Sequence, residues 1–154
     1  MFIRALKWLI IVLLAVVIVA AIVQFIIGPP YADSTPRAQV ADALLVANEH
    51  RTALATACSE GELRAGMANE DLGLRNPAAY NGKYVDSVSA STDSDHTARV
   101  EIVLRALYED THFFRTEAAE AGKTLIYEFR CEEDGGMNWK VVGGTLPQEY
   151  RPRY

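Results

Sequence analysis

The sequence contains few of the residues on which catalysis and metal binding commonly rest. Only two cysteines and three histidines occur in 154 residues. The histidines, His50, His96 and His112, lack the paired spacing of metal ligands, and we interpret them as solvated surface side chains. The sequence also lacks a glycine-rich phosphate loop and a nucleophile-elbow motif. We therefore expect no catalytic, cofactor or metal site, and hence no enzyme.

Acidic residues are absent from the first 32 positions, where Arg4 and Lys7 are the only charged residues. The apolar run from Leu9 to Ile27 has Gln24 as its one polar residue. As a helix, this run is long enough to cross the ~30 Å hydrocarbon core of a bilayer. Because basic residues beside a span tend to stay in the cytoplasm, the rest of the chain is predicted to lie outside it. A cleaved signal peptide is the alternative, although its apolar core is usually only ~7–15 residues long.

Basic residues are in the minority beyond this run. Of the 15 basic residues, 13 lie in residues 33–154 together with all 20 acidic residues, which gives this part a net charge of −7. General nucleic-acid binding needs a basic surface that neutralises phosphates, so nucleic acid is not expected as a partner. The length suits one domain. Its partner is predicted to be a protein or a lipid, and the sequence does not identify any small-molecule ligand.

An amphipathic helix is predicted to begin after Thr35, a good N-cap residue that is followed by Pro36 at the first helical position. Gly61 provides a natural end. One face of this helix is apolar except for Arg51, and the opposite face is polar and includes His50. The apolar positions are Val40, Leu44, Ala47, Leu54 and Cys58.

Four β-like segments follow an irregular stretch at residues 62–82. Alternating apolar residues place Val100, Ile102 and Leu104 on one face of a strand, and Leu125, Tyr127 and Phe129 on one face of another. The long connection from Tyr108 to Gly122 is expected to contain a helical turn at residues 116–121. The pattern predicts an α+β fold, in which the helix covers one face of a four-stranded antiparallel sheet. The predicted strands are residues 83–90, 96–107, 124–131 and 137–142.

The order of these motifs resembles the type IV pilin family. Residues 29–31, Pro-Pro-Tyr, are followed by Thr35-Pro36-Arg37-Ala38-Gln39-Val40-Ala41-Asp42-Ala43-Leu44, which is similar to the pilin stretch Thr-x-Arg-Ala-Gln-Val-x-Glu-Ala-Leu. Ala121-Gly122-Lys123-Thr124-Leu125 and Gly135-Gly136-Met137-Asn138-Trp139-Lys140 resemble the openings of later pilin strands. The resemblance implies a long N-terminal helix, a membrane span continuing into the amphipathic helix, packed on the sheet. The implied domains are a basic leader-like segment at 1–8, a transmembrane helix at 9–27 and a pilin-like extracytoplasmic domain at 33–154.

Two positions depart from the prepilin pattern. Lys7 stands where the resemblance implies the leader's final Gly, and Val12 stands where it implies the Glu that pairs with a neighbouring subunit during assembly. Without these determinants, the apolar helix resembles a permanent signal-anchor more than a fibre core. Pilins also often close a C-terminal loop with a disulfide. No cysteine follows Cys131 in this chain, so that loop is predicted to be unpinned.

Cys58 and Cys131 are predicted to point into the same interface if the helix packs on the sheet. A location outside the cytoplasm permits oxidation, so a Cys58–Cys131 disulfide is expected. Two buried free thiols are the alternative. Phe113 and Phe114 form an apolar cluster in the long connection, and we interpret them either as core lining or as an exposed contact for a partner.

The resemblance implies a bacterial inner-membrane protein with a periplasmic or surface domain. Its expected role is in pilus structure or assembly and in cell adhesion, through contacts with pilus subunits or the assembly machinery. The departures at Lys7 and Val12 favour an accessory or divergent subunit. The alternative is a stand-alone, membrane-tethered binding module that has a pilin fold and does not enter a fibre.

Overall fold

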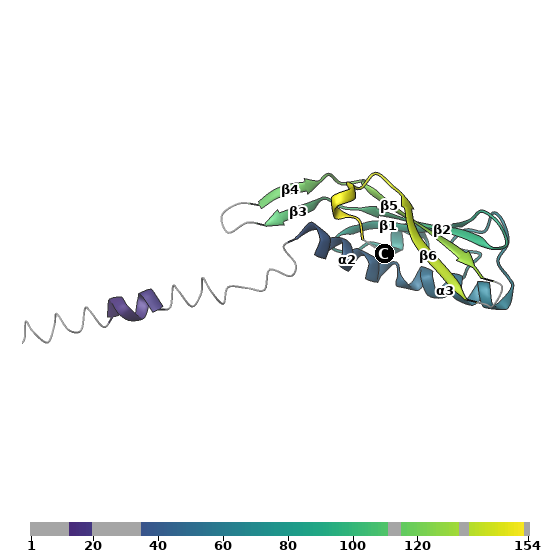
Figure 1. The fold of residues 1–154 in the computed structure, drawn as a ribbon, viewed down its shortest axis with the longest axis horizontal. Coiled ribbons are helices and arrows are strands. Elements are labelled where there is room, and N and C mark those ends of the chain that lie inside the picture. The colour runs from purple at the N-terminus through teal and green to yellow at the C-terminus, as the bar shows by residue number, and fades with distance from the viewer. Residues whose placement is uncertain (1–12, 20–34, 111–114, 133–135, 153–154) are drawn as a thin grey trace, which may run out of the picture. The chain divides into compact units, whose positions relative to one another are not determined.

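A computed structural model of the protein describes residues 13–19, 35–110, 115–132 and 136–152 (Figure 1). The chain divides into two compact units, Met1–Ala32 and Asp33–Tyr154. In the first unit, residues 13–19 are helical and their apolar side chains are exposed. Among the described residues, no helix is both long and apolar enough to span a bilayer. Lys7, Val12 and most of the predicted span at 9–27 lie outside the described residues.

The second unit is built on the four-stranded antiparallel sheet that the sequence predicts. The strands are β1 (Val85–Thr92), β2 (Thr97–Leu104), β5 (Thr124–Cys131) and β6 (Met137–Gly143), in the order β1-β2-β5-β6. The register pairs Val100 with Tyr127 and Tyr127 with Val141. The predicted inward residues form the centre of the core, which confirms the alternation. Val100, Ile102, Leu104, Leu125, Tyr127 and Phe129 are all buried.

Two helices replace the single helix predicted for residues 35–60. They are α2 (Pro36–Val46) and α3 (Asn48–Glu60), and they lie along the sheet (Figure 1). Thr35 caps α2 as predicted, because its side-chain oxygen accepts a hydrogen bond from the Ala38 N–H at 3.3 Å. Gly61 ends α3 in the left-handed conformation. The break falls at Ala47, where φ is −80° and ψ is −3°, and where the N–H bonds to the Leu45 carbonyl.

The buried face of the helices includes polar side chains. His50 is fully buried and Gln39 is 2% exposed, so the interpretation of His50 as a solvated surface residue is wrong. The buried positions recur at alternating intervals of three and four residues, which is the helical period. They are Val40, Ala43, Ala47, His50, Leu54 and Ala57. The helical spacing of the apolar residues therefore places position 50 on the buried face, although the polarity of the imidazole favoured an exposed position.

The long connection before β5 forms a second hairpin, not the predicted loop with a helical turn at residues 116–121. Strands β3 (Leu107–Asp110) and β4 (Arg115–Ala119) pair in an antiparallel fashion. Leu107 and Ala119 are buried, so core contacts and strand pairing outweigh the local helix propensity of this alanine-rich stretch. Gln39 fixes the hairpin to α2, since its amide donates to the Tyr108 carbonyl at 2.5 Å and accepts from the Tyr108 N–H at 2.9 Å.

The segment between α3 and β1 is irregular, as predicted, and covers the outer edge of β1. The Gly66 N–H donates to the Thr92 carbonyl, and the Thr92 N–H donates to the Met67 carbonyl. Ala68 forms an isolated bridge with Ser91, and the short 3₁₀-helix η2 (Pro77–Tyr80) completes the segment. Its backbone groups thus satisfy those of an edge strand, which would otherwise be open to other chains.

Candidate functional site

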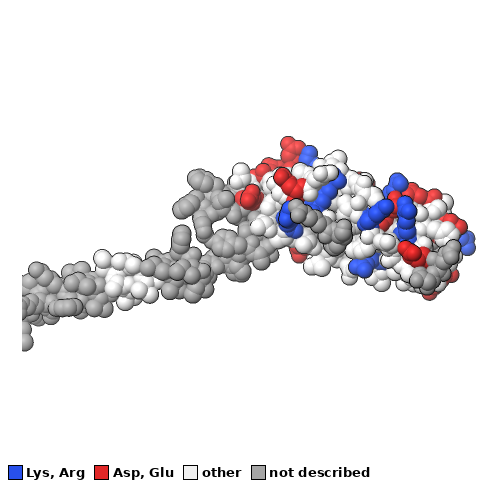
Figure 2. All heavy atoms as spheres, viewed as in Figure 1, with Lys and Arg blue, Asp and Glu red and all other residues white. Residues whose placement is uncertain are grey.

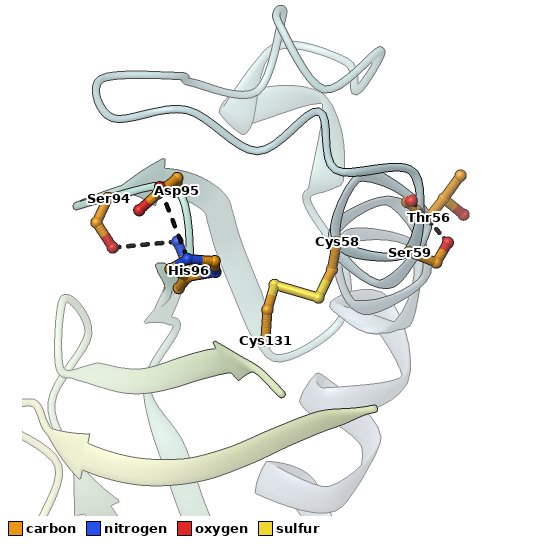
Figure 3. The surroundings of a disulfide bond; sticks show 7 residues. All are labelled: Thr56, Cys58, Ser59, Ser94, Asp95, His96 and Cys131. Carbon is orange, nitrogen blue, oxygen red and sulfur yellow. Dashed lines mark hydrogen bonds and ion pairs between the residues drawn. A yellow bond between two sulfur atoms is a disulfide. The ribbon is translucent and has the colours of Figure 1, made fainter. Parts of the chain in front are cut away.

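A disulfide joins Cys58, in the last turn of α3, to Cys131, at the end of β5 (Figure 3). The predicted bridge is therefore present. The Cα atoms are 5.8 Å apart, and the two cysteines are separated by 73 positions in the sequence. The bridge connects the C-terminal end of the helical layer to the sheet. It therefore restrains both layers against separation.

His96 is the histidine for which the surface interpretation holds. Its side chain is 74% exposed and lies 3.6 Å from the Asp95 carboxylate in the turn between β1 and β2 (Figure 3). His112, like Phe113 and Phe114, lies outside the described residues. Within the described part of the chain, no group of three His, Cys, Asp or Glu side chains is placed to hold a metal ion.

A buried polar cluster surrounds Asn69 and connects α3, the irregular segment and β1. The Asn69 amide nitrogen donates to the carbonyls of Arg75 at 2.9 Å and Val88 at 3.1 Å, and it lies 3.3 Å from His50 Nε2. The Asn69 carbonyl accepts a hydrogen bond from the Ala90 N–H at 2.5 Å. Asn69 therefore binds the edge of β1 between Val88 and Ala90 much as a neighbouring strand would.

The cluster favours the neutral form of His50. The two N–H groups of the Asn69 amide donate to the carbonyls of Arg75 and Val88, so the contact between this amide and His50 Nε2 does not determine the tautomer of the imidazole. Burial lowers the pKa of His50 from its ordinary value of 6.5, and Arg75 lowers it further, while the Val88 backbone and Glu49 partly oppose this shift. The imidazole also packs edge-to-face on Tyr80 at a centroid distance of 4.3 Å. The residue is thus a structural core histidine.

An aromatic group on β5 and β6 explains why Arg51 interrupts the apolar helix face. Trp139 stacks on Tyr127 at 4.7 Å and lies 5.4 Å from Phe129. The Arg51 guanidinium carbon lies 4.6 Å from the centre of the Trp139 ring. Arg51, which is exposed, therefore contributes a cation–π contact between α3 and β6.

The C-terminal segment, residues 144–152, has no disulfide, because Cys131 pairs with Cys58, but other contacts hold it in place. Leu146 is fully buried, and Arg151 donates from Nε to the Leu146 carbonyl and from Nη2 to the Gly144 carbonyl, both at 2.7 Å. Gly144 has a φ of 109°, and a Cβ atom at this position would overlap the Thr124 carbonyl. A buried side chain, guanidinium hydrogen bonds and a glycine turn thus replace the covalent closure.

The same segment folds back beside α2 (Figure 1). It contains the short 3₁₀-helix η3 (Gln148–Tyr150), whose Glu149 carbonyl accepts a hydrogen bond from Arg37 Nε at 2.8 Å. A cavity of about 220 Å³ lies between α2 and this segment. Its lining includes Arg37, Val40, Leu44, Tyr150, Arg151 and Pro152.

Positive and negative side chains alternate over the visible face of the domain (Figure 2). On the sheet, Glu128 lies 2.8 Å from Arg130 and 3.9 Å from Lys140, and Arg99 lies 3.1 Å from Asp93. On this face, the paired charges of the described residues form no continuous basic surface for a phosphate backbone.

Comparison with known proteins agrees with this architecture. The family model described as pilin, a bacterial filament protein, matches residues 36–154. No curated protein matches the chain. The matched region contains both helices that cover the sheet, all four strands of the sheet and the folded C-terminal segment. The chain therefore belongs to the pilin family, whose members are structural and non-enzymatic.

Proposed function

We propose that this protein is a membrane-anchored type IV pilin-like subunit that acts in pilus structure or assembly and in cell adhesion. The family match over residues 36–154, on a sheet covered by α2 and α3, is the observation that carries the proposal. The apolar run at 9–27 would hold the protein in the inner membrane of the bacterium as a single pass. The domain at 33–154 would lie in the periplasm or on the cell surface, where the Cys58–Cys131 disulfide is stable.

An accessory role suits the sequence better than that of a major fibre subunit. Lys7 replaces the glycine at which a leader would be removed, and Val12 replaces the glutamate that would pair with a neighbouring subunit. A buried carboxylate in a membrane is costly unless a partner compensates it, and Val12 removes both the cost and the need for that partner. The partners would then be pilus subunits or the assembly machinery, contacted through the folded domain.

Shearing and cell fractionation test this function. Surface fibres are sheared from cells that express the chain, and the protein is quantified in the fibre and membrane fractions, with and without the pilus assembly machinery. We expect the distribution of the protein between the fibre and membrane fractions to depend on that machinery. Identical fractionation in both strains, with no protein in sheared fibres, would contradict it.

The N-terminus of the protein recovered from cells tests the accessory role. An intact Met1 is expected for a permanent anchor. A chain that starts at Trp8 would show that Lys7 does not block leader removal and would restore the role of fibre subunit. A start near Asp33 would show that the apolar run is a cleaved signal.

A stand-alone binding module is the second candidate. The same two departures, at Lys7 and Val12, favour it, because a tethered module needs neither leader cleavage nor the assembly glutamate. It would remain in the membrane fraction whether or not the pilus machinery is present.

A further inference from the structure

Helix α2 presents an exposed apolar side chain beside acidic residues. Leu45 is 72% exposed and is the most exposed large apolar residue described in the second unit. Asp42 and Glu49 lie three residues before it and four residues after it, and so on the same helical face. Both are exposed, and Glu49 is 3.4 Å from Arg75 in a solvent-accessible ion pair. This face therefore consists of one apolar projection flanked by carboxylates.

A different face of α2 lines the cavity beside the C-terminal segment. Val40 and Leu44 provide apolar walls, and Arg37 and Arg151 provide guanidinium groups. Because a cavity of about 150 Å³ is large enough for benzene, the cavity of about 220 Å³ can accept a leucine side chain.

The arginines at this cavity are fixed in orientation. Arg37 uses Nε to bind the Glu149 carbonyl, and Arg151 uses Nε and Nη2 to bind the carbonyls of Leu146 and Gly144. A guanidinium group carries five N–H donors, so each arginine has donors beyond these bonds. Two carboxylates, Glu149 and Glu109, also lie close enough to act electrostatically on Tyr150 at this cavity. Because they offset the positive charge of the arginines, the attraction for a further carboxylate comes from the oriented guanidinium N–H groups and not from a large net charge.

We propose that Leu45 of one copy of this chain inserts into the cavity between α2 and η3 of a second copy, with Asp42 and Glu49 beside the second copy's Arg37 and Arg151. The inference rests on the proposed function, because it assigns a self-association surface to a pilin-family protein. Charge complementarity supports this occupant: the apolar projection has acidic neighbours, and at the apolar cavity Arg37 and Arg151 keep N–H donors for a carboxylate, although Glu149 and Glu109 lie near Tyr150 there.

The geometry of the contact makes it heterologous. Leu44 lines the cavity and Leu45 projects away from it, and successive helix residues point about 100° apart around the axis. Each copy therefore offers a projection on one face of α2 and a cavity on another. A heterologous contact of this kind can be repeated from copy to copy, which yields rings or open helical assemblies.

Cysteine cross-linking of the full chain in cell membranes tests the contact. Leu45→Cys and Pro152→Cys are combined, and a mild oxidant is added before electrophoresis without reductant. We expect a ladder of dimers, trimers and larger products from the double variant. An equal mixture of the two single variants is expected to give dimers only, and each single variant alone none. In the double variant, adding Arg37→Glu is expected to weaken the ladder.

Thr52→Cys combined with Pro152→Cys is the matched control. Thr52 is exposed on the same helical face as Leu45, seven residues further on and therefore about 10 Å along the axis. This pair is expected to give no ladder. Thermal unfolding of each variant verifies folding, and it should not change for Leu45→Cys, because that side chain is exposed in a single copy.

Three outcomes would overturn the contact. The first is a ladder from the control pair equal to that from the test pair. The second is dimers from Leu45→Cys alone, which would indicate a symmetric contact between α2 helices. The third is no product from the test pair. Fractionation of the wild-type chain distinguishes failure of the proposed contact from failure of the proposed function. Protein in sheared fibres without the ladder would refute only the contact, whereas a ladder without any dependence on the pilus machinery would refute only the function.

Discussion

Replacement of Asn69 by alanine should destabilise the domain more than any surface substitution does. Asn69 is 3% exposed and holds three backbone groups of two segments, namely the Arg75 and Val88 carbonyls and the Ala90 N–H. An alanine side chain can neither donate nor accept, so these groups would lose their partner. His50 Nε2 would lose its contact with the Asn69 amide as well.

The magnitude follows from the number of groups left without a partner. Each hydrogen bond contributes about 1 kcal/mol net, and a buried group left unsatisfied costs roughly 1–3 kcal/mol. Ala90 is 4% exposed, so water cannot readily replace the acceptor for its N–H. We therefore expect the free energy of unfolding to fall by about 3–5 kcal/mol for Asn69→Ala, with most of the loss from the Ala90 N–H. This is a large part of the ~5–15 kcal/mol typical of a domain.

Urea unfolding of the full chain in detergent, followed by tryptophan fluorescence with the disulfide intact, measures this loss. Asn138→Ala is the matched control, because Asn138 is exposed on β6, and its effect should stay within about 0.5 kcal/mol. Equal midpoints for the two variants would refute the assigned role of Asn69. Asn69→Asp sharpens the test: a carboxylate beside His50 should oppose the lowering of the pKa of that imidazole, so the loss of stability below pH 6.5 should be smaller in this variant than in the wild type.

Three further predictions concern the titration, the disulfide and the C-terminal segment. The wild-type protein should be most stable above pH 6.5 and lose stability as the pH falls below 6.5, because His50 is protonated more readily in the unfolded chain than in the buried site. Urea midpoints across pH 5–8 check this, and His50→Gln should flatten the pH profile of stability. Cys58→Ser with Cys131→Ser should lower the free energy of unfolding by about 4 kcal/mol, from the chain entropy of a loop closed over 73 positions; urea unfolding measures it, and a change below about 1 kcal/mol would contradict that estimate. Arg151→Ala should release the C-terminal segment, since it removes the hydrogen bonds to the Leu146 and Gly144 carbonyls. Hydrogen exchange at the Leu146 N–H, which donates to the Thr124 carbonyl, should then accelerate, while exchange in β2 stays unchanged.

Local patterns predicted the sheet and the ends of the helical layer well. The alternation of Leu125, Tyr127 and Phe129 is a property of neighbouring residues in a strand, and the structure places all three in the core. Thr35 and Gly61 are local signals as well, since each acts on the backbone of its own helix end. The pairing of Cys58 with Cys131 followed from placing both on facing layers.

The predictions failed where distant segments decide the outcome. The residues at 116–121 have helix propensity, yet the stretch pairs with β3, because Leu107 and Ala119 are buried together. Ala47 divides the helical layer although no glycine or proline marks the position. His50 was read as a surface residue because its partner, Asn69, lies 19 positions away in an irregular segment.

By itself, the sequence determined the α+β class, the strand alternation, the disulfide pair and the resemblance to pilins, because periodicity and motif order are written in neighbouring residues. Only the tertiary structure decided that His50 and Asn69 form a buried cluster and that Arg151 fastens the C-terminal segment. It also decided that α2 presents Leu45 on one face and lines a cavity on another. The physical reason is that burial and hydrogen-bond partners depend on segments brought together by folding, which no local pattern records.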